Sequence, residues 1–366
     1  MTAPRPRPGI MDIKVYTPGK SSVGGRTAAM KLSSNESALG PSPRALAAYR
    51  EVAEKLHRYP DGTARALREA IGARYGLDPA RIICGAGSDE LIYNVARGFA
   101  GPGDEIVMSE HGFNIYPIVT NSVGATLVTA PETDLTFDVD AVLGRVTART
   151  KVVFIANPNN PTGTYIPAEA LRRLRAGLRD DIVLVIDAAY AEYVIRNDYT
   201  PGTELVDEGV NTVMTRTFSK IFALAALRIG WAYCPPPIYD VLERLRAPFN
   251  ISTAAQAAGK AAMEDSEHVA ASRDHNAVWL PWMTERFREA GLHVHPSVAN
   301  FVLVRFPDDP ARNAEAAFEF FGGRGIIGRE TGGYGLPGWL RFTIGREDEM
   351  RAVADAARDF MAGARG

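Results

Sequence analysis

Residues 151–163 read KVVFIANPNNPTG, an apolar run of strand length that ends in a turn of prolines, asparagines and a glycine. Similar apolar runs recur along the chain, at RIICGAG (81–87), DEIVMS (104–109), ATLVTA (125–130), DIVLVIDAAY (181–190) and NTVMTRT (211–217). Amphipathic stretches of helical length are interspersed with them, at 42–56, 63–75, 88–100, 167–179 and 223–233. Continuous apolar strands alternating with helices are typical of a parallel sheet covered on both faces. The sequence therefore predicts an α/β fold with a mostly parallel central sheet.

The pattern changes after about residue 235, where CPPP interrupts it. A long helical region is expected from 252 to about 290, and two further strand candidates are NFVLVRF (300–306) and WLRFTIG (339–345). Additional helices are expected near 311–323 and at about 347–361. We therefore predict three parts: an N-terminal arm at 1–35, a large domain at 36–250 and a smaller α+β domain at 251–366.

Composition excludes several classes of protein. Of 366 residues, 46% are hydrophobic and 23% are charged, which is enough to bury a substantial core. The net charge of −2 argues against nonspecific binding of nucleic acid. Two cysteines, Cys84 and Cys234, disfavour a disulfide scaffold, and the sequence offers no set of residues at metal-ligand spacing. Because no apolar run is long enough for a secretion signal or a membrane span, we expect a cytoplasmic protein.

Polar residues follow several of the expected strands, which is where ligands bind in open α/β sheets. After RIIC, the glycine-rich GAGSDE (85–90) leads into a helix, so Ser88 and Asp89 lie where free amides and the helix dipole suit a phosphate. The alternative is a simple turn capped by Ser or Asp. Likewise, the Asn-Pro repeat at 157–163, which includes Asn160, is either a structural loop or a source of amides facing a ligand.

Two charged residues stand in apolar surroundings. Asp187 ends the run DIVLVID, and a buried carboxylate there needs a cation or a protonated ring nitrogen as partner unless it serves as a helix N-cap. Lys220 lies between Phe218 and Phe222, which favours a partly desolvated amine able to form a Schiff base over an ordinary surface lysine. Arg228 follows eight positions later, close to two helical turns, and is expected to face the same cavity.

The order and spacing of these residues are more specific than any one of them. Asn160, Asp187 and Lys220 are separated by 27 and 33 residues. Together with several other segments, this set resembles the pyridoxal-phosphate aminotransferases of fold type I. Those segments are YTPGK (16–20), LSSNES (32–37), HRYPDG (57–62), RTFSKIFALAALRIGW (216–231) and WLRFTIG (339–345). Within them it is most similar to the histidinol-phosphate aminotransferase family, and the resemblance extends from about residue 10 to 360.

The resemblance implies the cofactor pyridoxal 5'-phosphate and assigns most of its contacts. Lys220 would bond covalently to the cofactor and act as the catalytic acid and base, while Asp187 would pair with its ring nitrogen. Asn160 and Tyr190 would hydrogen-bond the ring's phenolic oxygen, and Phe113 would stack on the ring. The cofactor phosphate would contact residues from both subunits of a homodimer, namely Ser88, Asp89, Ser219, Arg228 and, from the neighbouring subunit, Tyr59.

The resemblance also implies a substrate site and a reaction. Arg341 matches an arginine that clamps a substrate carboxylate, and Arg329 and Tyr16 match positions that contact a substrate phosphate. Gly328 departs from the family pattern, in which a bulky aliphatic residue is common. The implied reaction transfers an amino group between L-histidinol phosphate and 2-oxoglutarate in histidine synthesis.

Three alternatives stay open at this point. The same cofactor residues would serve an aromatic amino acid aminotransferase, which would differ only in the outer pocket. A non-catalytic pyridoxal-phosphate-binding domain of the kind fused to DNA-binding regions is disfavoured because no basic block or helix-turn-helix precedes residue 35. A decarboxylase on the same fold has no motif in its favour. The six histidines show no nucleophile or metal arrangement.

Overall fold

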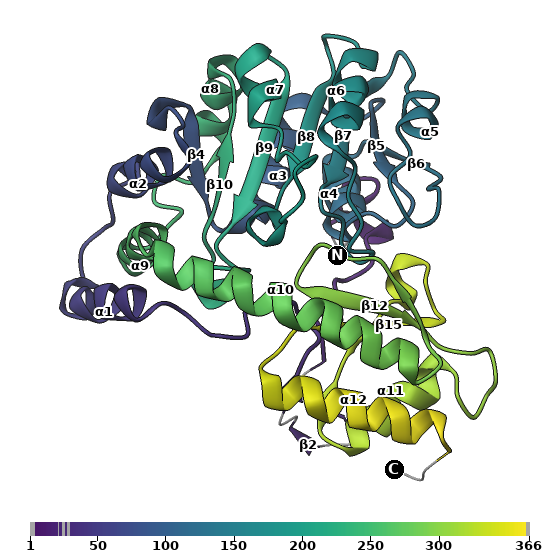
Figure 1. The fold of residues 1–366 in the computed structure, drawn as a ribbon. Coiled ribbons are helices and arrows are strands. Elements are labelled where there is room, and N and C mark those ends of the chain that lie inside the picture. The colour runs from purple at the N-terminus through teal and green to yellow at the C-terminus, as the bar shows by residue number, and fades with distance from the viewer. Residues whose placement is uncertain (1–3, 21, 24–25, 28–29, 364–366) are drawn as a thin grey trace.

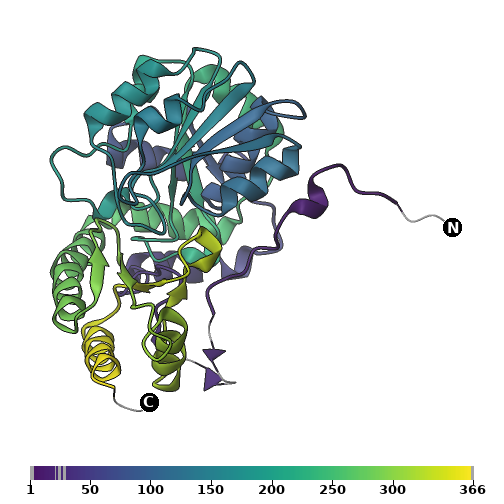
Figure 2. The same ribbon diagram turned by 90° about the vertical axis from the view of Figure 1, so that its right-hand side faces the viewer.

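The computed structural model describes residues 4–20, 22–23, 26–27 and 30–363. Its largest feature is a seven-stranded sheet with helices on both faces, and a smaller antiparallel sheet with its own helices lies below it in Figure 1. The N-terminal segment extends away from the body as an arm (Figure 2). None of the helices in the described ranges is both long and apolar enough to cross a membrane.

The large sheet is mostly parallel, as predicted. Its strands in spatial order are β4 (Ile82–Gly85), β10 (Gly230–Tyr233), β9 (Thr212–Thr217), β8 (Val183–Asp187), β7 (Thr150–Ala156), β5 (Glu105–Ser109) and β6 (Thr126–Ala130). Every pair from β9 to β6 is parallel, whereas β10 runs antiparallel to both β4 and β9. The α/β fold class is thereby confirmed.

The central strand β8 shows why these runs are apolar throughout. Val183 and Val185 pack into the hydrophobic cluster on one face of the sheet, and Leu184 and Ile186 pack into the cluster on the other. Because both faces are covered, successive side chains are all buried although they point in opposite directions.

The helices of the large part follow the predicted alternation. Their bounds are α1 (Pro43–Glu51), α2 (Arg65–Tyr75), α3 (Gly87–Phe99), α4 (Ile115–Val123), α5 (Val139–Leu143), α6 (Ala168–Gly177), α7 (Thr203–Glu208) and α8 (Pro236–Leu245). The helix expected at 42–56 is shorter, because α1 ends at Glu51 and a separate 3-10 turn covers Ala53–Lys55.

The helix expected at 223–233 is wrong. Ala223 and Arg228 both adopt left-handed backbone conformations, with φ of 56° and 50°, which a continuous helix excludes. A single 3-10 turn, Ala225–Leu227, lies between them. The chain then enters the buried strand β10. Gly230 starts that strand where a Cβ atom would lie 2.2 Å from the Ser88 amide nitrogen, so β10 and the start of α3 approach too closely for a side chain.

The helical region expected at 252–290 is divided in two. Asp265 separates α9 (Thr253–Glu264) from α10 (Ser266–Glu289), and its carboxylate accepts a hydrogen bond from the His268 amide at the start of α10. The α9 helix packs against α1 and α2, and α10 continues toward the small sheet (Figure 1). The domain limits at residues 35 and 250 stay a prediction.

The C-terminal part has its own sheet and core. The sheet is antiparallel, in the order β11 (His293–His295), β12 (Phe301–Arg305), β15 (Trp339–Thr343) and β14 (Arg329–Glu330). The helices α11 (Ala314–Gly323) and α12 (Glu347–Met361) share its core with the C-terminal part of α10. A parallel pair joins β13 (Ile326–Ile327) to β3 (Met30–Lys31), so the end of the expected N-terminal arm is attached to this part of the molecule.

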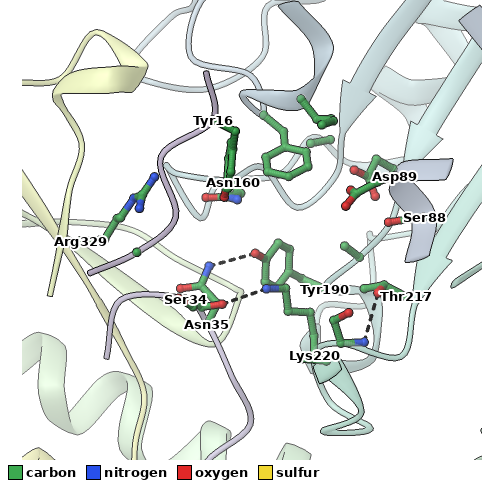
Figure 3. A pocket seen from close by; sticks show the side chains of 18 of the residues that line it. Tyr16, Ser34, Asn35, Ser88, Asp89, Asn160, Tyr190, Thr217, Lys220 and Arg329 are labelled. Carbon is green, nitrogen blue, oxygen red and sulfur yellow. Dashed lines mark hydrogen bonds between the residues drawn. The ribbon is translucent and has the colours of Figure 1, made fainter. Parts of the chain in front are cut away.

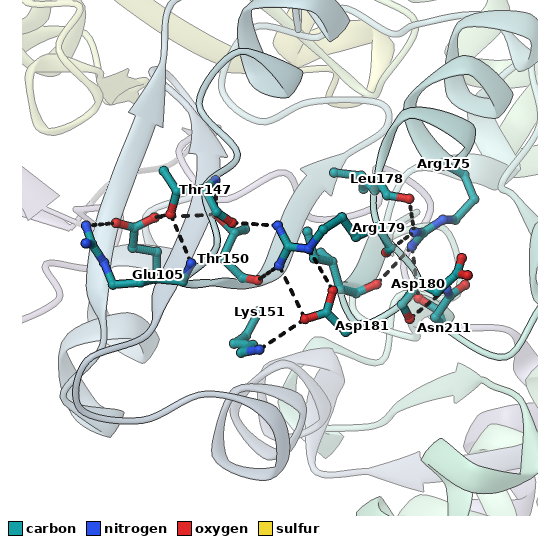
Figure 4. A network of polar contacts seen from close by, with 12 residues as sticks. Glu105, Thr147, Thr150, Lys151, Arg175, Leu178, Arg179, Asp180, Asp181 and Asn211 are labelled. Carbon is teal, nitrogen blue, oxygen red and sulfur yellow. Dashed lines mark hydrogen bonds and ion pairs between the residues drawn. The ribbon is translucent and has the colours of Figure 1, made fainter.

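A polar network fastens the amino ends of the parallel strands, opposite the edge where their carboxyl ends lie (Figure 4). Arg179 donates to the carbonyl oxygens of Thr147 and Thr150 at 2.6 and 3.1 Å and pairs with Asp181 at 2.9 Å. The Thr147 hydroxyl donates in turn to Glu105 at the start of β5, and this hydrogen bond is the main reason that the Glu105 pKa lies below its ordinary value. The network fixes the register of strands whose other ends carry the polar residues singled out above.

The close approach at Gly230 yields a stability prediction. Gly230→Ala places a methyl group against backbone atoms of Gly87 and Ser88, which cannot move without displacing α3, so we expect a loss of about 1–3 kcal/mol in the free energy of unfolding. Gly101→Ala is the matched control, because a Cβ atom there meets nothing within 4 Å. Thermal and urea unfolding of both variants would measure the effect, and equal stability of the two would contradict it.

Candidate active site

A cavity of about 510 Å³ lies at the carboxyl ends of the parallel strands, between the large sheet, the N-terminal segment and the small sheet. Twelve of the thirteen predicted site residues line it: Tyr16, Ser88, Asp89, Phe113, Asn160, Asp187, Tyr190, Ser219, Lys220, Arg228, Arg329 and Arg341. Figure 3 shows Lys220 and Tyr190 facing Ser88 and Asp89 across it, with Tyr16 and Arg329 on another side. Sequence positions more than 300 residues apart are thus brought to one cavity.

Asp187, the last residue of β8, is a buried carboxylate on the cavity wall. The hydroxyls of Tyr116 and Thr215 donate to its two oxygens at 3.2 and 3.4 Å. Burial raises its pKa to about 6, the nearby Asp89 charge acts in the same direction, and the two hydrogen bonds oppose the rise. An oriented carboxylate that carries no ion pair in the described structure is suited to a cationic group on a ligand.

Lys220 has the properties of a reactive amine. Burial and, to a smaller extent, the positive charge of Arg341 together lower its pKa to about 8. Its Nζ donates to the Ser34 carbonyl oxygen at 3.0 Å, which holds the amine on the cavity wall. An amine with this pKa exists partly in its neutral, nucleophilic form near neutral pH.

The start of α3 forms an anion site with the segment after β9. Arg228 donates to the Ser219 hydroxyl at 3.2 Å and pairs with Asp89 at 3.2 Å. Gly87 has a φ of 81°, and a Cβ atom there would lie 2.5 Å from Arg228 Nη2. The glycine therefore allows the Arg228 guanidinium to approach the start of α3, next to Ser88 and the amide groups of a helix N-terminus, which is the environment that a phosphate requires.

Arg341 is a buried cation on β15. Its Nη1 donates to Asn160 Oδ1 and its Nη2 donates to the Ser33 carbonyl oxygen at 3.0 Å, while its Nε, also buried, has no partner among the described residues. It also lies over the Phe301 ring, with 5.1 Å between the guanidinium carbon and the ring centroid. The unsatisfied Nε and the uncompensated charge both favour an anionic ligand.

Arg329 and Tyr16 lie on the outer side of the cavity. Arg329 Nη2 donates to the Thr17 carbonyl oxygen at 2.8 Å and so holds the arm that carries Tyr16. Burial raises the pKa of Tyr16, Tyr334 adds to the rise and Arg329 opposes it. Gly328 is also explained, because a Cβ atom there would lie 2.7 Å from the Phe342 ring, which takes the place of a bulky side chain at residue 328.

Tyr59 is the one predicted residue outside the cavity. Its side chain is 82% exposed and stacks on Phe249, with ring centroids 4.6 Å apart. The structure of one chain therefore leaves its expected contact with a neighbouring subunit untested.

Several cavity residues carried no chemical signal in the sequence. Asn35 and Ser34 lie in the LSSNES segment (32–37), but the sequence patterns assign them no role. The patterns likewise assign no role to Tyr93, Thr217 or Tyr334. Tyr116, which hydrogen-bonds Asp187, belongs to none of the sequence motifs quoted above. Among the residues that the structure describes, no group of three or more His, Cys, Asp or Glu side chains is placed to hold a metal ion.

Comparison with known proteins identifies close relatives. A family model described as "Aminotransferase class I and II" matches residues 27–356. The histidinol-phosphate aminotransferase of Paramagnetospirillum magneticum is 57% identical and that of Rhodospirillum centenum is 56% identical, each covering 99% of this chain and 99% or more of the relative. The crystal structure of histidinol-phosphate aminotransferase from Sinorhizobium meliloti in complex with pyridoxal-5'-phosphate has a TM-score of 0.86 at 30% identity, covering 93% of this chain and 92% of that one.

The raised pKa of Asp187 predicts how stability depends on pH in the cofactor-free protein. Because the pKa is about 6 in the folded state against an ordinary value of 3.8, this carboxyl stabilises the fold below about pH 4, and that contribution is lost as the pH rises through 6. We expect the free energy of unfolding of the wild type, relative to Asp187→Asn, to fall by about 1–3 kcal/mol over this window in urea titrations.

Asp181→Asn serves as the control. Hydrogen bonds from Arg179 and Lys151 lower the pKa of the exposed Asp181 to about 2, so its contribution is lost as the pH falls below about 4. A difference between wild type and Asp187→Asn that stays constant from pH 4 to pH 6 would refute the raised pKa.

Proposed function

The chain belongs to the class I and II aminotransferases, and on that basis we propose that it is a pyridoxal-phosphate enzyme that exchanges an amino group between L-histidinol phosphate and 2-oxoglutarate, giving imidazole-acetol phosphate and glutamate. The observation that carries the proposal is the cavity itself, which joins a desolvated lysine, a buried carboxylate and two separate cationic ends. Identity of 53–57% over the full length to proteins named histidinol-phosphate aminotransferase supports this choice of substrate.

The residues present fit pyridoxal phosphate. The start of α3, where Gly87 admits the Arg228 guanidinium beside Ser88 and Ser219, suits its phosphate, and the carboxylate of Asp187 suits a protonated ring nitrogen. Phe113, Asn160 and Tyr190 line the intervening wall, where we assign them to the face and the phenolic oxygen of the ring. Bound pyridoxal phosphate supplies a carbonyl for exchange of amino groups and a ring that withdraws electrons from the carbon that loses its proton.

Lys220 is assigned two tasks. Its amine holds the cofactor covalently in the resting enzyme and moves a proton once an amino substrate has taken its place. The pKa of about 8 suits both tasks, because the amine can hold or release a proton near neutral pH. The carboxylate of Asp187 is assigned to the protonated ring nitrogen.

The second cationic end of the cavity is assigned to the substrates. Glutamate and 2-oxoglutarate carry carboxylates that match the planar fork of Arg341, whereas histidinol phosphate carries a phosphate ester in place of an α-carboxylate. Arg329 and Tyr16, at the outer side, are assigned to that phosphate. One cavity can then accept the amino donor and the 2-oxo acid acceptor in turn, as two half-reactions at a single site require.

We also propose that the enzyme is a cytoplasmic homodimer. Tyr59 and Phe249 are 82% and 50% exposed yet stacked on each other, and the N-terminal arm extends away from the body (Figure 2). Exposed aromatic pairs are characteristic of interfaces. A second copy packed there would bring Tyr59 to its cofactor phosphate.

A donor comparison tests the substrate. We expect kcat/KM for L-histidinol phosphate to exceed that for L-phenylalanine, L-tyrosine and L-tryptophan by roughly 30- to 1,000-fold, about 2–4 kcal/mol in transition-state binding, with 2-oxoglutarate as acceptor. Arg329→Gln should remove most of this preference while leaving the rates with aromatic donors nearly unchanged. Comparable wild-type rates with aromatic donors would instead establish an aromatic aminotransferase whose main substrate contact is Arg341.

A lysine substitution tests the cofactor site. Lys220→Ala should bind pyridoxal phosphate without the visible absorbance of the covalently held cofactor and should lose transamination, since no other amine is assigned to hold it. Lys31→Ala is the control, because Lys31 also lines the cavity but is paired with Glu36 at 2.7 Å. Absorbance spectra and rates would be compared, and transamination at the wild-type rate in Lys220→Ala would refute the assignment.

A further inference from the structure

Asn35 is a residue of the cavity wall to which the proposed reaction assigns no role. Its side chain is 1% exposed, and its backbone is in the left-handed conformation, with a φ of 56°, which asparagine adopts more readily than most residues. It follows Ser34, whose carbonyl oxygen accepts the hydrogen bond from Lys220. A buried polar side chain in an unusual backbone conformation requires specific partners.

Those partners come from the segment after β8, from β15 and from the residue before β12. Asn35 Nδ2 donates to the Tyr190 hydroxyl oxygen at 2.9 Å, as Figure 3 shows. Its backbone amide donates to Thr343 Oγ1 at 2.9 Å, and its carbonyl oxygen accepts from Asn300 Nδ2 at 3.2 Å. Asn35 therefore connects the cavity tyrosine to β15, the strand that carries Arg341.

The direction of the hydrogen bond to Tyr190 has a chemical consequence. An amide nitrogen only donates, so the Tyr190 oxygen is the acceptor and its own hydrogen must point elsewhere. Tyr190 is buried and lines the cavity, so the direction left for its hydrogen is toward the cavity.

We propose that Asn35 is a positioning residue that orients the Tyr190 hydroxyl so that its hydrogen is donated into the cofactor cavity. The proposal rests on the proposed function, because the acceptor is the cofactor oxygen assigned to Tyr190. A hydrogen bond donated to that oxygen stabilises its anionic form and lowers the pH at which the bound chromophore loses its proton. Loosening the donor should therefore raise that pH.

Asn35→Gly is the variant that tests this, because glycine accepts a φ of 56° without strain and removes only the amide. The variant is reconstituted with pyridoxal phosphate, and its visible absorbance is titrated across the pH range in which it stays folded. We expect the midpoint to rise by about half a pH unit to one unit relative to the wild type. Tyr190→Phe should raise it at least as much, and Asn35→Gly should add nothing in the Tyr190→Phe background.

Asn300→Ala separates positioning from a purely structural role. Asn300 Nδ2 supports the same segment through the carbonyl oxygens of Asn35 and Glu36 but makes no hydrogen bond to Tyr190 in the described part of the chain. We expect Asn300→Ala to lower the unfolding temperature and leave the absorbance midpoint unchanged. A midpoint in Asn35→Gly that is unchanged or lower, or a rise that persists in the Tyr190→Phe background, would overturn the proposal.

The wild type and Lys220→Ala report on the proposed function separately. The cofactor assignment fails if the wild type does not gain the visible absorbance of the covalently held cofactor, or if Lys220→Ala retains that absorbance. The proposal for Asn35 then fails with it. If both behave as expected while Asn35→Gly shows no rise, only the proposal for Asn35 fails.

Discussion

Lys220 and Asp187 are both withdrawn from water in one cavity without forming an ion pair with each other. Burial shifts the pKa of the amine down to about 8 and that of the carboxyl up to about 6, so each group is brought toward neutrality from opposite directions. Such groups destabilise the folded protein, since the charged form of each is better solvated in the unfolded chain. The remainder of the fold compensates for this, with three apolar clusters packed on the large sheet and a fourth around the small one.

The parallel strands place the buried charged groups of the cavity at one end of the sheet and a stabilising polar network at the other. Their carboxyl ends deliver Asp187 and the segments after β7 and β9 to one edge, while the hydrogen-bonded network of Arg179 lies at the other (Figure 4). The antiparallel β10 makes the anion site possible, because the chain must turn back after Lys220 and so carries Arg228 to the start of α3. Gly230 and Gly87 are the two places where this packing leaves no room for a side chain.

The sequence predicts the part of this arrangement that local patterns encode. Apolar runs identify the strands, and polar residues after them identify Asp187, Asn160 and Lys220 without any knowledge of their contacts. The turn at 223–233 escapes prediction because its alanines and leucines favour a helix, whereas the left-handed residues that break it are imposed by tertiary packing. Asn35 escapes it for a different reason: its partner Tyr190 is 155 positions away, and nothing local marks the pair. The role of Tyr59 depends on a second chain, so the structure of one chain does not supply it.

Arg341 connects the substrate site assigned to it with the basicity of Lys220. Its charge lowers the pKa of Lys220, while its guanidinium is held by Asn160 and the Ser33 carbonyl oxygen and has an unpartnered Nε. A substrate anion bound at Arg341 offsets that charge, and the amine of Lys220 then becomes more basic. In the proposed reaction this change falls at the stage at which an amino substrate has displaced Lys220 and the amine must accept a proton. The arginine assigned to the substrate carboxylate would thus also adjust the basicity of Lys220.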